Sequence, residues 1–250
     1  MKIKYTINNL DYHITFCSKK SKNNISKSLD KIKSDKNILL LYDEKVNKNI
    51  VNEVREDLKL SGCNIHLMKC EGNKINKNEK FLFRILDFLI KKKFTKRSVI
   101  ISFGGGVVGD VSALASSLYL RGLYYYNIPS TMTAIIDSCV GGKTAINYKG
   151  ITNSIGTYYH PINVFILEDI IRELPNREFY AGLAEVIKCG VIDDQNILKF
   201  LKKNKEKIIS REYNCISKLC YLTLKSKIKF FINDIYENNK RLYLNFGHTI

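Results

Sequence analysis

The sequence lacks the features that mark secreted, membrane-spanning or disulfide-stabilised proteins. It has no Trp and only three Pro, and its seven cysteines, an odd number, form no C-x-x-C pair, which favours reduced thiols. The first segment, MKIKYTINNLDYHITF, has no apolar core of the kind that a signal peptide needs. The most hydrophobic helix candidate, FLFRILDFLI, is interrupted by Arg84 and Asp87. These absences predict a soluble, cytoplasmic protein with no membrane partner.

A tract of Lys and Arg is also absent, although the formal net charge is +17. The basic residues are spread along the whole chain, mixed with Asn and Ile, and no nucleic-acid-binding motif accompanies them. We therefore expect no nucleic-acid partner. A basic surface would instead help to attract a small anionic substrate.

Apolar residues make up 45% of the chain, enough for a core, and their pattern predicts an α/β fold. Short apolar runs predict buried strands at 37–42, 98–103, 124–128 and 163–167. Helical spacing predicts helices at 51–60 and 81–92, and then, after Pro175, at 177–191, 195–209 and 213–231. We expect a Rossmann-like, mainly parallel-sheet domain over residues 1–174, followed by an all-helical domain over residues 175–250.

A glycine-rich segment, ISFGGGVVGD, follows the second predicted strand and precedes a predicted helix at 111–120. Its Gly104-x-Gly106-x-x-Gly109 spacing is typical of a dinucleotide-binding turn, where bare backbone and helix N–H groups face a phosphate. However, the turn does not follow the first predicted strand, and no acidic residue lies about twenty positions later to bind a ribose. Asp43, at the end of the first predicted strand, is a substitute. The alternative is a tight turn that needs glycine only for packing.

A second polar cluster, PSTMTAIIDSCVGGKTAIN, begins where the third predicted strand ends. Ser130 and Thr131 stand at the mouth of the sheet, and Asp137 follows a helical turn later. The letters GGKT resemble the end of a phosphate-binding P-loop, but the glycine required at position 137 is Asp, which excludes that motif. Lys143 remains as a lysine on a flexible turn, suited to an anionic group, or as an ordinary loop lysine.

Two further clusters lie in the helical region. Glu185 and Lys188 share a helix face among apolar neighbours, so we expect a largely buried helix whose carboxylate needs a metal or a cation. Arg241, Asn245 and His248 have a spacing that places them on one helical face. A lone His is more often structural than a metal ligand, so this cluster alone does not decide between the two.

Together these segments resemble the 3-dehydroquinate synthase family. The matching pieces are GGGVVGD, DSCVGGKTAIN, NSIGTYYHP, LPNREFYAGLAEVIKCG and LNFGHT, in the order and spacing of the family. The resemblance implies an NAD-binding α/β domain and a helical domain that holds zinc, cobalt or another divalent metal. It also implies a cytoplasmic lyase of the shikimate pathway, which leads to chorismate and the aromatic amino acids. That enzyme converts 3-deoxy-D-arabino-heptulosonate 7-phosphate to 3-dehydroquinate by transient oxidation with NAD, phosphate elimination, re-reduction and aldol closure.

The resemblance assigns a role to each candidate residue. The NAD-binding residues would be Asp43, Gly104, Gly105, Gly106, Asp110, Ser130 and Thr131. The metal ligands would be Glu185 and His248. The residues around the sugar phosphate would be Asp137, Lys143, Asn153, Lys188, Lys227, Arg241 and Asn245. Arg121 would reach into the site of a neighbouring subunit, which implies a homodimer.

The sequence departs from the family pattern near the cofactor. Asn73 and Asn76 stand where the family loop Gly-Glu-x-x-Lys has Glu and Lys, Thr152 replaces a Lys, and Glu173 replaces a Thr. These changes predict weaker NAD binding unless another geometry compensates.

The chain also ends before the second metal-binding His of the family, so we expect a fragment or a truncated product with little activity. The alternatives are another sugar-phosphate cyclase, an oxidoreductase similar to glycerol dehydrogenase, and an inactive remnant that only binds a nucleotide or a partner.

Overall fold

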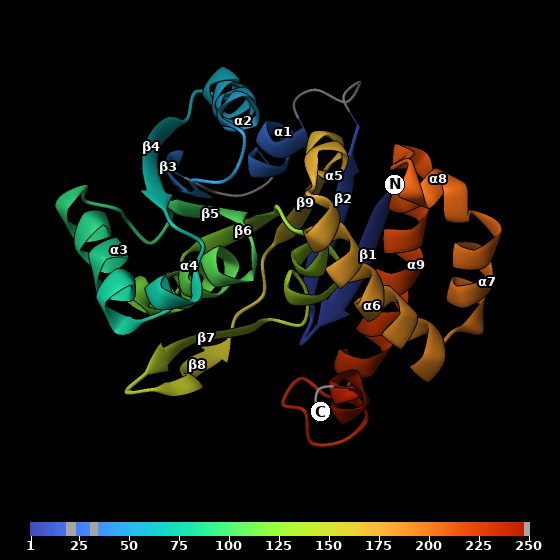
Figure 1. Cartoon of the computed structure of the whole chain (residues 1–250). Helices are drawn as coiled ribbons and strands as arrows, with labels where there is room; N and C mark the ends of the chain where they lie inside the picture. Colours follow the sequence, from blue (N-terminus) through green and yellow to red (C-terminus); the bar gives the residue numbers. More distant parts are fainter. Residues whose placement is uncertain (19–23, 31–34, 248–250) are drawn as a thin grey trace.

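A seven-stranded sheet forms the centre of the molecule (Figure 1), with strand order β1-β2-β9-β6-β5-β3-β4. The computed structural model describes residues 1–18, 24–30 and 35–247. All neighbouring strands are parallel except β1, which pairs antiparallel with β2. The strands are β1 (Lys2–Ile7), β2 (Leu10–Cys17), β3 (Asn37–Asp43), β4 (Asn64–Cys70), β5 (Val99–Gly104), β6 (Tyr124–Pro129) and β9 (Asn163–Leu167). The expectation of a mainly parallel α/β sheet is confirmed.

The central strands are apolar throughout because both faces of the sheet are covered. On β3, Ile38 and Leu40 contribute to one hydrophobic cluster, whereas Leu39 and Leu41 contribute to the other. This alternation follows from the two-residue period of a strand, and it explains why the run shows no polar positions. Around the sheet lie α1 (Asn24–Leu29), α2 (Lys48–Leu60), α3 (Glu79–Lys91), α4 (Gly106–Leu118) and α5 (Glu168–Glu173).

The last part of the described chain is helical, as predicted, with α6 (Asn176–Ile192), α7 (Gln195–Lys203), α8 (Lys205–Ile209) and α9 (Tyr213–Phe231). The single helix expected over 195–209 is wrong. Asn204 divides it into α7 and α8, and its side chain donates to the carbonyl of Phe200 at 2.9 Å. Helix α9 packs on the sheet, where Tyr5 and Phe231 meet edge to face with ring centroids 5.7 Å apart. The domain boundary near residue 174 stays a prediction.

Several strands were not predicted from the sequence. They are the β1–β2 hairpin, β4, and a separate two-stranded hairpin of β7 (Lys143–Tyr148) and β8 (Ile151–Tyr158), which extends from the body in Figure 1. Strand β8 is exposed over nearly its whole length, so it carries no buried apolar pattern. Because β1 and β2 come first, Asp43 ends the third strand of the chain rather than the first. Among the described residues, no helix is long and apolar enough to cross a membrane.

Candidate active site

The glycine segment forms the turn between β5 and α4, at the carboxyl edge of the sheet. Helix α4 begins at Gly106, earlier than expected, and within the described chain no side chain caps its N-terminus. A Cβ atom on Gly104 would lie 2.6 Å from Val108, and one on Gly105 would lie 3.2 Å from Thr131. Position 104 therefore requires glycine, and the 13-residue helix that follows begins without a side-chain cap, which leaves its first N–H groups for a ligand.

The other predicted cofactor residues lie around this turn. Asp43 is 6% exposed, and its Oδ1 accepts from the backbone N–H groups of Lys45 at 3.1 Å and Gly72 at 3.4 Å. The N–H of Ser130 donates to the carbonyl of Gly104 at 2.8 Å. The arrangement fits a dinucleotide, because an uncapped helix N-terminus and a buried carboxylate on a neighbouring strand end face the same edge.

A lysine that the sequence analysis missed lies beside the cofactor candidates. The Nζ atom of Lys77 is 2.5 Å from Oδ2 of Asp110 and 2.5 Å from Oδ1 of Asn153. Burial raises the pKa of Asp110, the positive charge of Lys77 opposes that rise, and the charge of Asp137 adds to it. The start of α4 also lies close to the second polar cluster, since a Cβ atom on Gly106 would lie 3.3 Å from the hydroxyl of Ser138.

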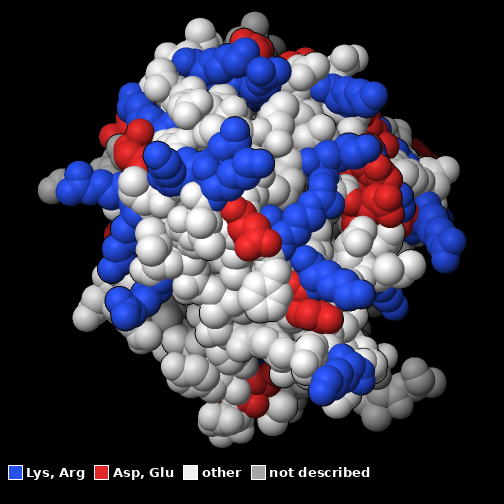
Figure 2. Space-filling model, turned by 90° about the vertical axis from the view of Figure 1, so that its left-hand side faces the viewer, with Lys and Arg blue, Asp and Glu red and all other residues white. Residues whose placement is uncertain are grey.

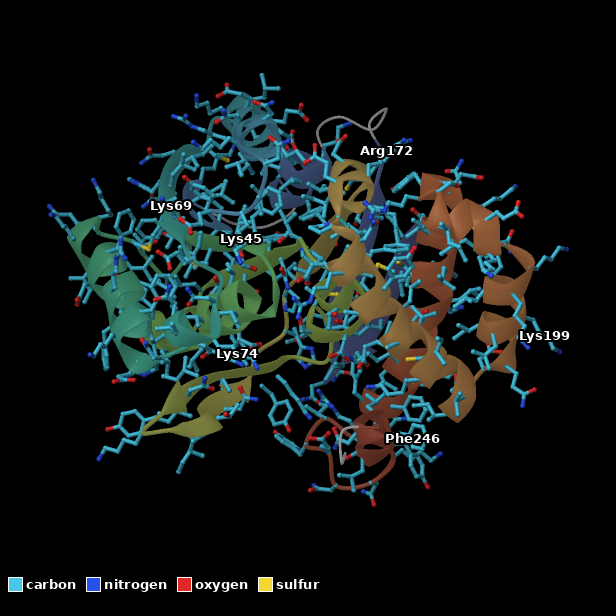
Figure 3. All side chains as sticks on the ribbon, in the orientation of Figure 1. Lys45, Lys69, Lys74, Arg172, Lys199 and Phe246 are labelled. Atoms are coloured by element: carbon cyan, nitrogen blue, oxygen red, sulfur yellow. The ribbon has the colours of Figure 1, made fainter. Side chains whose placement is uncertain are left out.

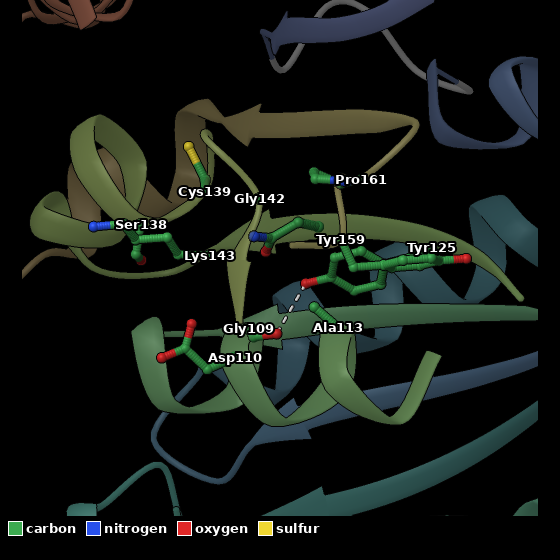
Figure 4. A pocket seen from close by; sticks show the side chains of 11 residues that line it. Gly109, Asp110, Ala113, Tyr125, Ser138, Cys139, Gly142, Lys143, Tyr159 and Pro161 are labelled. Carbon is green, nitrogen blue, oxygen red and sulfur yellow. Dashed lines mark hydrogen bonds between the residues drawn. The ribbon is translucent and has the colours of Figure 1, made fainter. Parts of the chain in front are cut away.

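A small pocket lies between the first turns of α4 and the start of β7 (Figure 4). Its volume is about 10 Å³, room for roughly one water molecule, and its lining includes Asp110, Ser138 and Lys143. The hydroxyl of Tyr125 in the pocket wall donates to the carbonyl of Gly109 at 3.1 Å. This bond fixes the start of α4 against β6.

Two lysine–carboxylate pairs lie deeper, between a π-helical turn (Ala134–Ser138) and helices α6 and α9. Lys227 donates to the carboxylate of Asp137 and, at 2.5 Å, to its backbone carbonyl, whereas Lys188 pairs with Glu185. Both lysine side chains are only 8% exposed. Burial raises the pKa of Cys189 to about 11, and the charges of all four paired groups act on the same thiol. Three of the predicted substrate residues, Asp137, Lys188 and Lys227, therefore lie with Glu185 around one buried thiol.

The expectation that the helix of Glu185 is largely buried is wrong on one face. Tyr180, Ile187 and Val191 of α6 are 49%, 46% and 55% exposed. Together with Ala184 they recur at helical spacing, so they form an exposed apolar stripe on the side of α6 opposite the buried Gly182 and Cys189.

Lys143 begins strand β7 instead of lying on a flexible turn. Gly141 and Gly142, with φ angles of +86° and +68°, make the turn before it. The ammonium of Lys143 pairs with Glu237, which also accepts from Nδ2 of Asn245 at 3.1 Å. The sequence analysis did not single out Glu237, since nothing in its local pattern distinguishes it from a surface carboxylate.

Arg241 and Asn245 do not share a face, contrary to the prediction. The segment Lys240–Asn245 is a 3₁₀ helix, and its three-residue turn buries Arg241 with Leu244 and leaves Asn245 exposed. The guanidinium of Arg241 donates to two backbone carbonyls, including that of Gly141 at 2.8 Å. His248 lies outside the described residues.

Arg121 is far from these residues within the chain. It lies beyond the opposite end of α4, about 20 Å from the glycine turn by helix rise, and it has a φ of +65°. The site therefore contains no contribution from Arg121 of the same subunit.

The described residues do not by themselves make a metal centre. Among them, no group of three His, Cys, Asp or Glu side chains could hold a metal ion. Glu185 already has a cationic partner in Lys188. The predicted metal site thus stays a prediction for the complete protein.

Solved structures with a similar fold include two synthases and a glycerol dehydrogenase. A 2-deoxy-scyllo-inosose synthase, crystallised with carbaglucose-6-phosphate, NAD⁺ and Co²⁺, has a TM-score of 0.87 at 23% identity and covers 99% of this chain and 67% of its own. The 2-epi-5-epi-valiolone synthase ValA of Streptomyces hygroscopicus subsp. jinggangensis 5008, with NAD⁺ and Zn²⁺ bound, has a TM-score of 0.83 at 21% identity, covering 98% and 68%. A glycerol dehydrogenase from Schizosaccharomyces pombe reaches 0.60 at 15% identity, covering 84% and 59%.

Comparisons of sequence identify one family within this fold. The family model of the 3-dehydroquinate synthase N-terminal region matches residues 67–181, and that of the C-terminal region matches residues 182–250. The 3-dehydroquinate synthase of Prochlorococcus marinus (strain MIT 9312) is 38% identical over 91% of this chain and 64% of its own length. That of Ruminiclostridium cellulolyticum (strain ATCC 35319 / DSM 5812 / JCM 6584 / H10) is 34% identical over 99% of this chain and 69% of its own. The chain thus spans about two thirds of the length of such relatives, and it belongs to the 3-dehydroquinate synthase family.

Proposed function

We propose that the complete protein is a 3-dehydroquinate synthase, a lyase that releases phosphate from 3-deoxy-D-arabino-heptulosonate 7-phosphate and closes the carbocycle. The observation that carries this proposal is that two features lie close together. An uncapped glycine turn meets a cluster of lysines paired with carboxylates. Two of these lysines are buried, where desolvation strengthens their attraction for a phosphate or a carboxylate.

The glycine turn is the proposed NAD site. The N–H groups of α4 would hold the pyrophosphate, Thr131 would line the turn, and the carboxylates of Asp43 and Asp110 would accept hydrogen bonds from ribose hydroxyls. When bound, NAD would accept a hydride from the substrate and later return it. The residues present fit the cofactor, because the helix begins without a side-chain cap beside glycines that leave the backbone bare.

The lysine cluster is the proposed substrate site. Lys143, Lys188 and Lys227 each pair with a carboxylate, which orients their ammonium groups. An anionic substrate would exchange with the partners of Lys188 and Lys227 at a lower cost in desolvation, because these two lysines are already removed from water.

Other parts of the proposal depend on the complete protein. Glu185 and His248 would hold a divalent metal, which would polarise a substrate hydroxyl. The exposed Arg121 would act in the site of a second copy, so the protein would be a homodimer. The surface carries Lys and Arg over much of the face in Figure 2, which would favour the approach of an anionic substrate. We also retain a cytoplasmic location and the two-domain division as predictions.

Phosphate release by the full-length protein tests the function. With NAD and zinc present, we expect phosphate to appear together with 3-dehydroquinate and no net NADH. Sustained NADH production would instead indicate a dehydrogenase, and phosphate release only from a different sugar phosphate would indicate another cyclase. Inactivity with every substrate would favour the alternative of an inactive remnant that only binds a nucleotide or a partner.

A pair of variants tests whether activity depends on a lysine of the proposed site or only on the overall positive charge of the protein. Lys188→Met should lower kcat/KM at least 100-fold, because it removes a buried cation that faces the substrate. Lys199→Met on α7, whose side chain points into solvent at the edge of the molecule in Figure 3, should leave kcat/KM within twofold. Equal effects of the two substitutions would contradict the placement of the site.

A further inference from the structure

Two buried hydroxyl groups hold the first turns of α4 from outside the helix. The hydroxyl of Tyr125 on β6 donates to the carbonyl of Gly109 at 3.1 Å. The hydroxyl of Thr144 on β7 donates to the backbone carbonyl of Asp110 at 3.1 Å. Both side chains are buried, and a carbonyl oxygen has a second lone pair for such a bond beyond the one used within the helix. Two successive carbonyls of one helix are therefore tied to two different strands.

The first turn of α4 is one that needs support from outside. It runs from Gly106 to Gly109 with two valines between them, and all four residues have lower helix propensity than alanine or leucine. Among the described residues, no side chain caps its N-terminus, whereas Asn78 caps α3 by accepting from the N–H of Phe81 at 2.9 Å. The turn is therefore held in place less by its own sequence than by the groups that it contacts.

The two bonds together restrain the helix more than one bond does. Successive residues are about 100° apart around the axis of an α-helix, so the carbonyls of Gly109 and Asp110 lie on different sides of it. A single bond allows the helix to pivot about that bond, whereas two bonds on different sides also limit its rotation about the axis. Because the side chain of Asp110 turns with its backbone, the two hydroxyls determine where its carboxylate points.

We propose that Tyr125 and Thr144 are positioning residues of the dinucleotide site. By fixing the first turns of α4, they keep the first N–H groups of the helix directed at a pyrophosphate and the carboxylate of Asp110 directed at a ribose. Neither residue has to touch the cofactor for this effect. The inference rests on the proposed function, because it requires a dinucleotide at the glycine turn.

Calorimetric titration of the full-length protein with NAD⁺ tests the proposal without a turnover assay. Tyr125→Phe and Thr144→Val each remove one hydroxyl at nearly constant volume. Each should weaken the Kd for NAD⁺ about fivefold, the equivalent of one ordinary hydrogen bond, because the cofactor must restore an orientation that the bond no longer stabilises. Thr144→Ser keeps the hydroxyl and should restore the wild-type Kd.

Tyr159→Phe is the matched control. Tyr159 lines the same pocket as Tyr125 (Figure 4), and its hydroxyl donates to the carbonyl of Leu123 at 2.5 Å, which lies after α4 and away from its first turn. This variant should leave the Kd for NAD⁺ unchanged, even if it lowers the temperature of thermal unfolding as much as Tyr125→Phe does. Loss of affinity in step with loss of thermal stability in all three variants would indicate a purely structural role and would overturn the proposal.

Hydrogen exchange followed by mass spectrometry measures the position of the helix directly. Without NAD⁺, the amides of residues 104–113 should exchange faster in Tyr125→Phe and Thr144→Val than in the wild-type protein, because the first turns open more often. Tyr159→Phe should show wild-type exchange in this segment. Wild-type exchange or wild-type affinity in Tyr125→Phe and Thr144→Val would overturn the positioning role, whereas no NAD⁺ binding by the wild-type protein would overturn the proposed function.

Discussion

His160 should make the folded protein sensitive to acid. Its ring lies between the aromatic rings of Tyr12, with centroids 5.0 Å apart, and Phe231, at 6.3 Å. Among the described residues, neither ring nitrogen has a hydrogen-bond partner. Burial, with a further contribution from the charge of Arg241, lowers the pKa of His160 from 6.5 to about 4. The imidazole is therefore neutral in the folded protein at pH 7.

The expected effect on stability follows from proton linkage. Between pH 6.5 and about 4, the unfolded chain carries a proton on this imidazole and the folded chain does not, so stability rises with pH over this range. At about 1.4 kcal/mol per pKa unit, the free energy of unfolding should be about 3 kcal/mol higher at pH 7 than at pH 4 because of this group. Below pH 4 both states are protonated and the effect stops changing.

Urea unfolding followed by circular dichroism from pH 4.5 to 7.5 measures this effect. His160→Gln keeps a similar volume and cannot titrate, so the wild-type free energy should fall more steeply with acid than that of the variant. Carboxylates titrate in both proteins and cancel in the difference. Parallel pH curves for the two proteins would refute the reasoning.

Two further substitutions are expected to destabilise the turn and pocket that join the proposed cofactor and substrate sites. Gly142→Ala should lower the free energy of unfolding in urea by about 2 kcal/mol, because φ is +68° and the new Cβ would lie 2.6 Å from the imidazole of His160. Gly150→Ala, with φ of +81° and nothing within 4 Å, should cost only about 1 kcal/mol, and equal costs would show that the contact is unimportant. Tyr125→Phe should lower the free energy of unfolding by about 1–2 kcal/mol, because the carbonyl of Gly109 loses its hydroxyl donor. The control, Tyr236→Phe at an exposed position, should leave the free energy of unfolding unchanged. An unchanged free energy in Tyr125→Phe would contradict this prediction.

The central sheet was predictable because burial on both faces leaves a continuous apolar run. Strands β3, β5, β6 and β9 all have this property, and their predicted ranges agree with the structure to within two residues. Strand β1 alternates exposed Lys2 and Lys4 with buried Ile3 and Tyr5, which is the two-residue period of a half-buried strand, so the prediction missed a signal that the sequence contains. Strand β8 gives none, because its pairing with β7 is stabilised by the backbone and not by a buried face.

The site was predictable only where its residues stand in continuous motifs. The glycine turn, Asp137, Glu185 and Lys188 could be singled out in this way. Lys77 could not, because its contact with Asp110 spans 33 residues and depends on how one loop crosses the glycine helix. A periodic pattern also misled the prediction for Arg241, since a 3₁₀ turn and an α-helical turn bring different residues to the same face.

The pairing of β2 with β9 has a consequence for the order of folding during synthesis. Thr15 and Asn163 are neighbours in the sheet but 148 residues apart in the chain. At roughly 5–20 residues per second, a ribosome needs on the order of ten seconds to make the segment between them. During that interval the first hairpin has no strand to dock on, so it should be among the last elements to become protected from hydrogen exchange in a nascent chain. The strand made first therefore completes the sheet last.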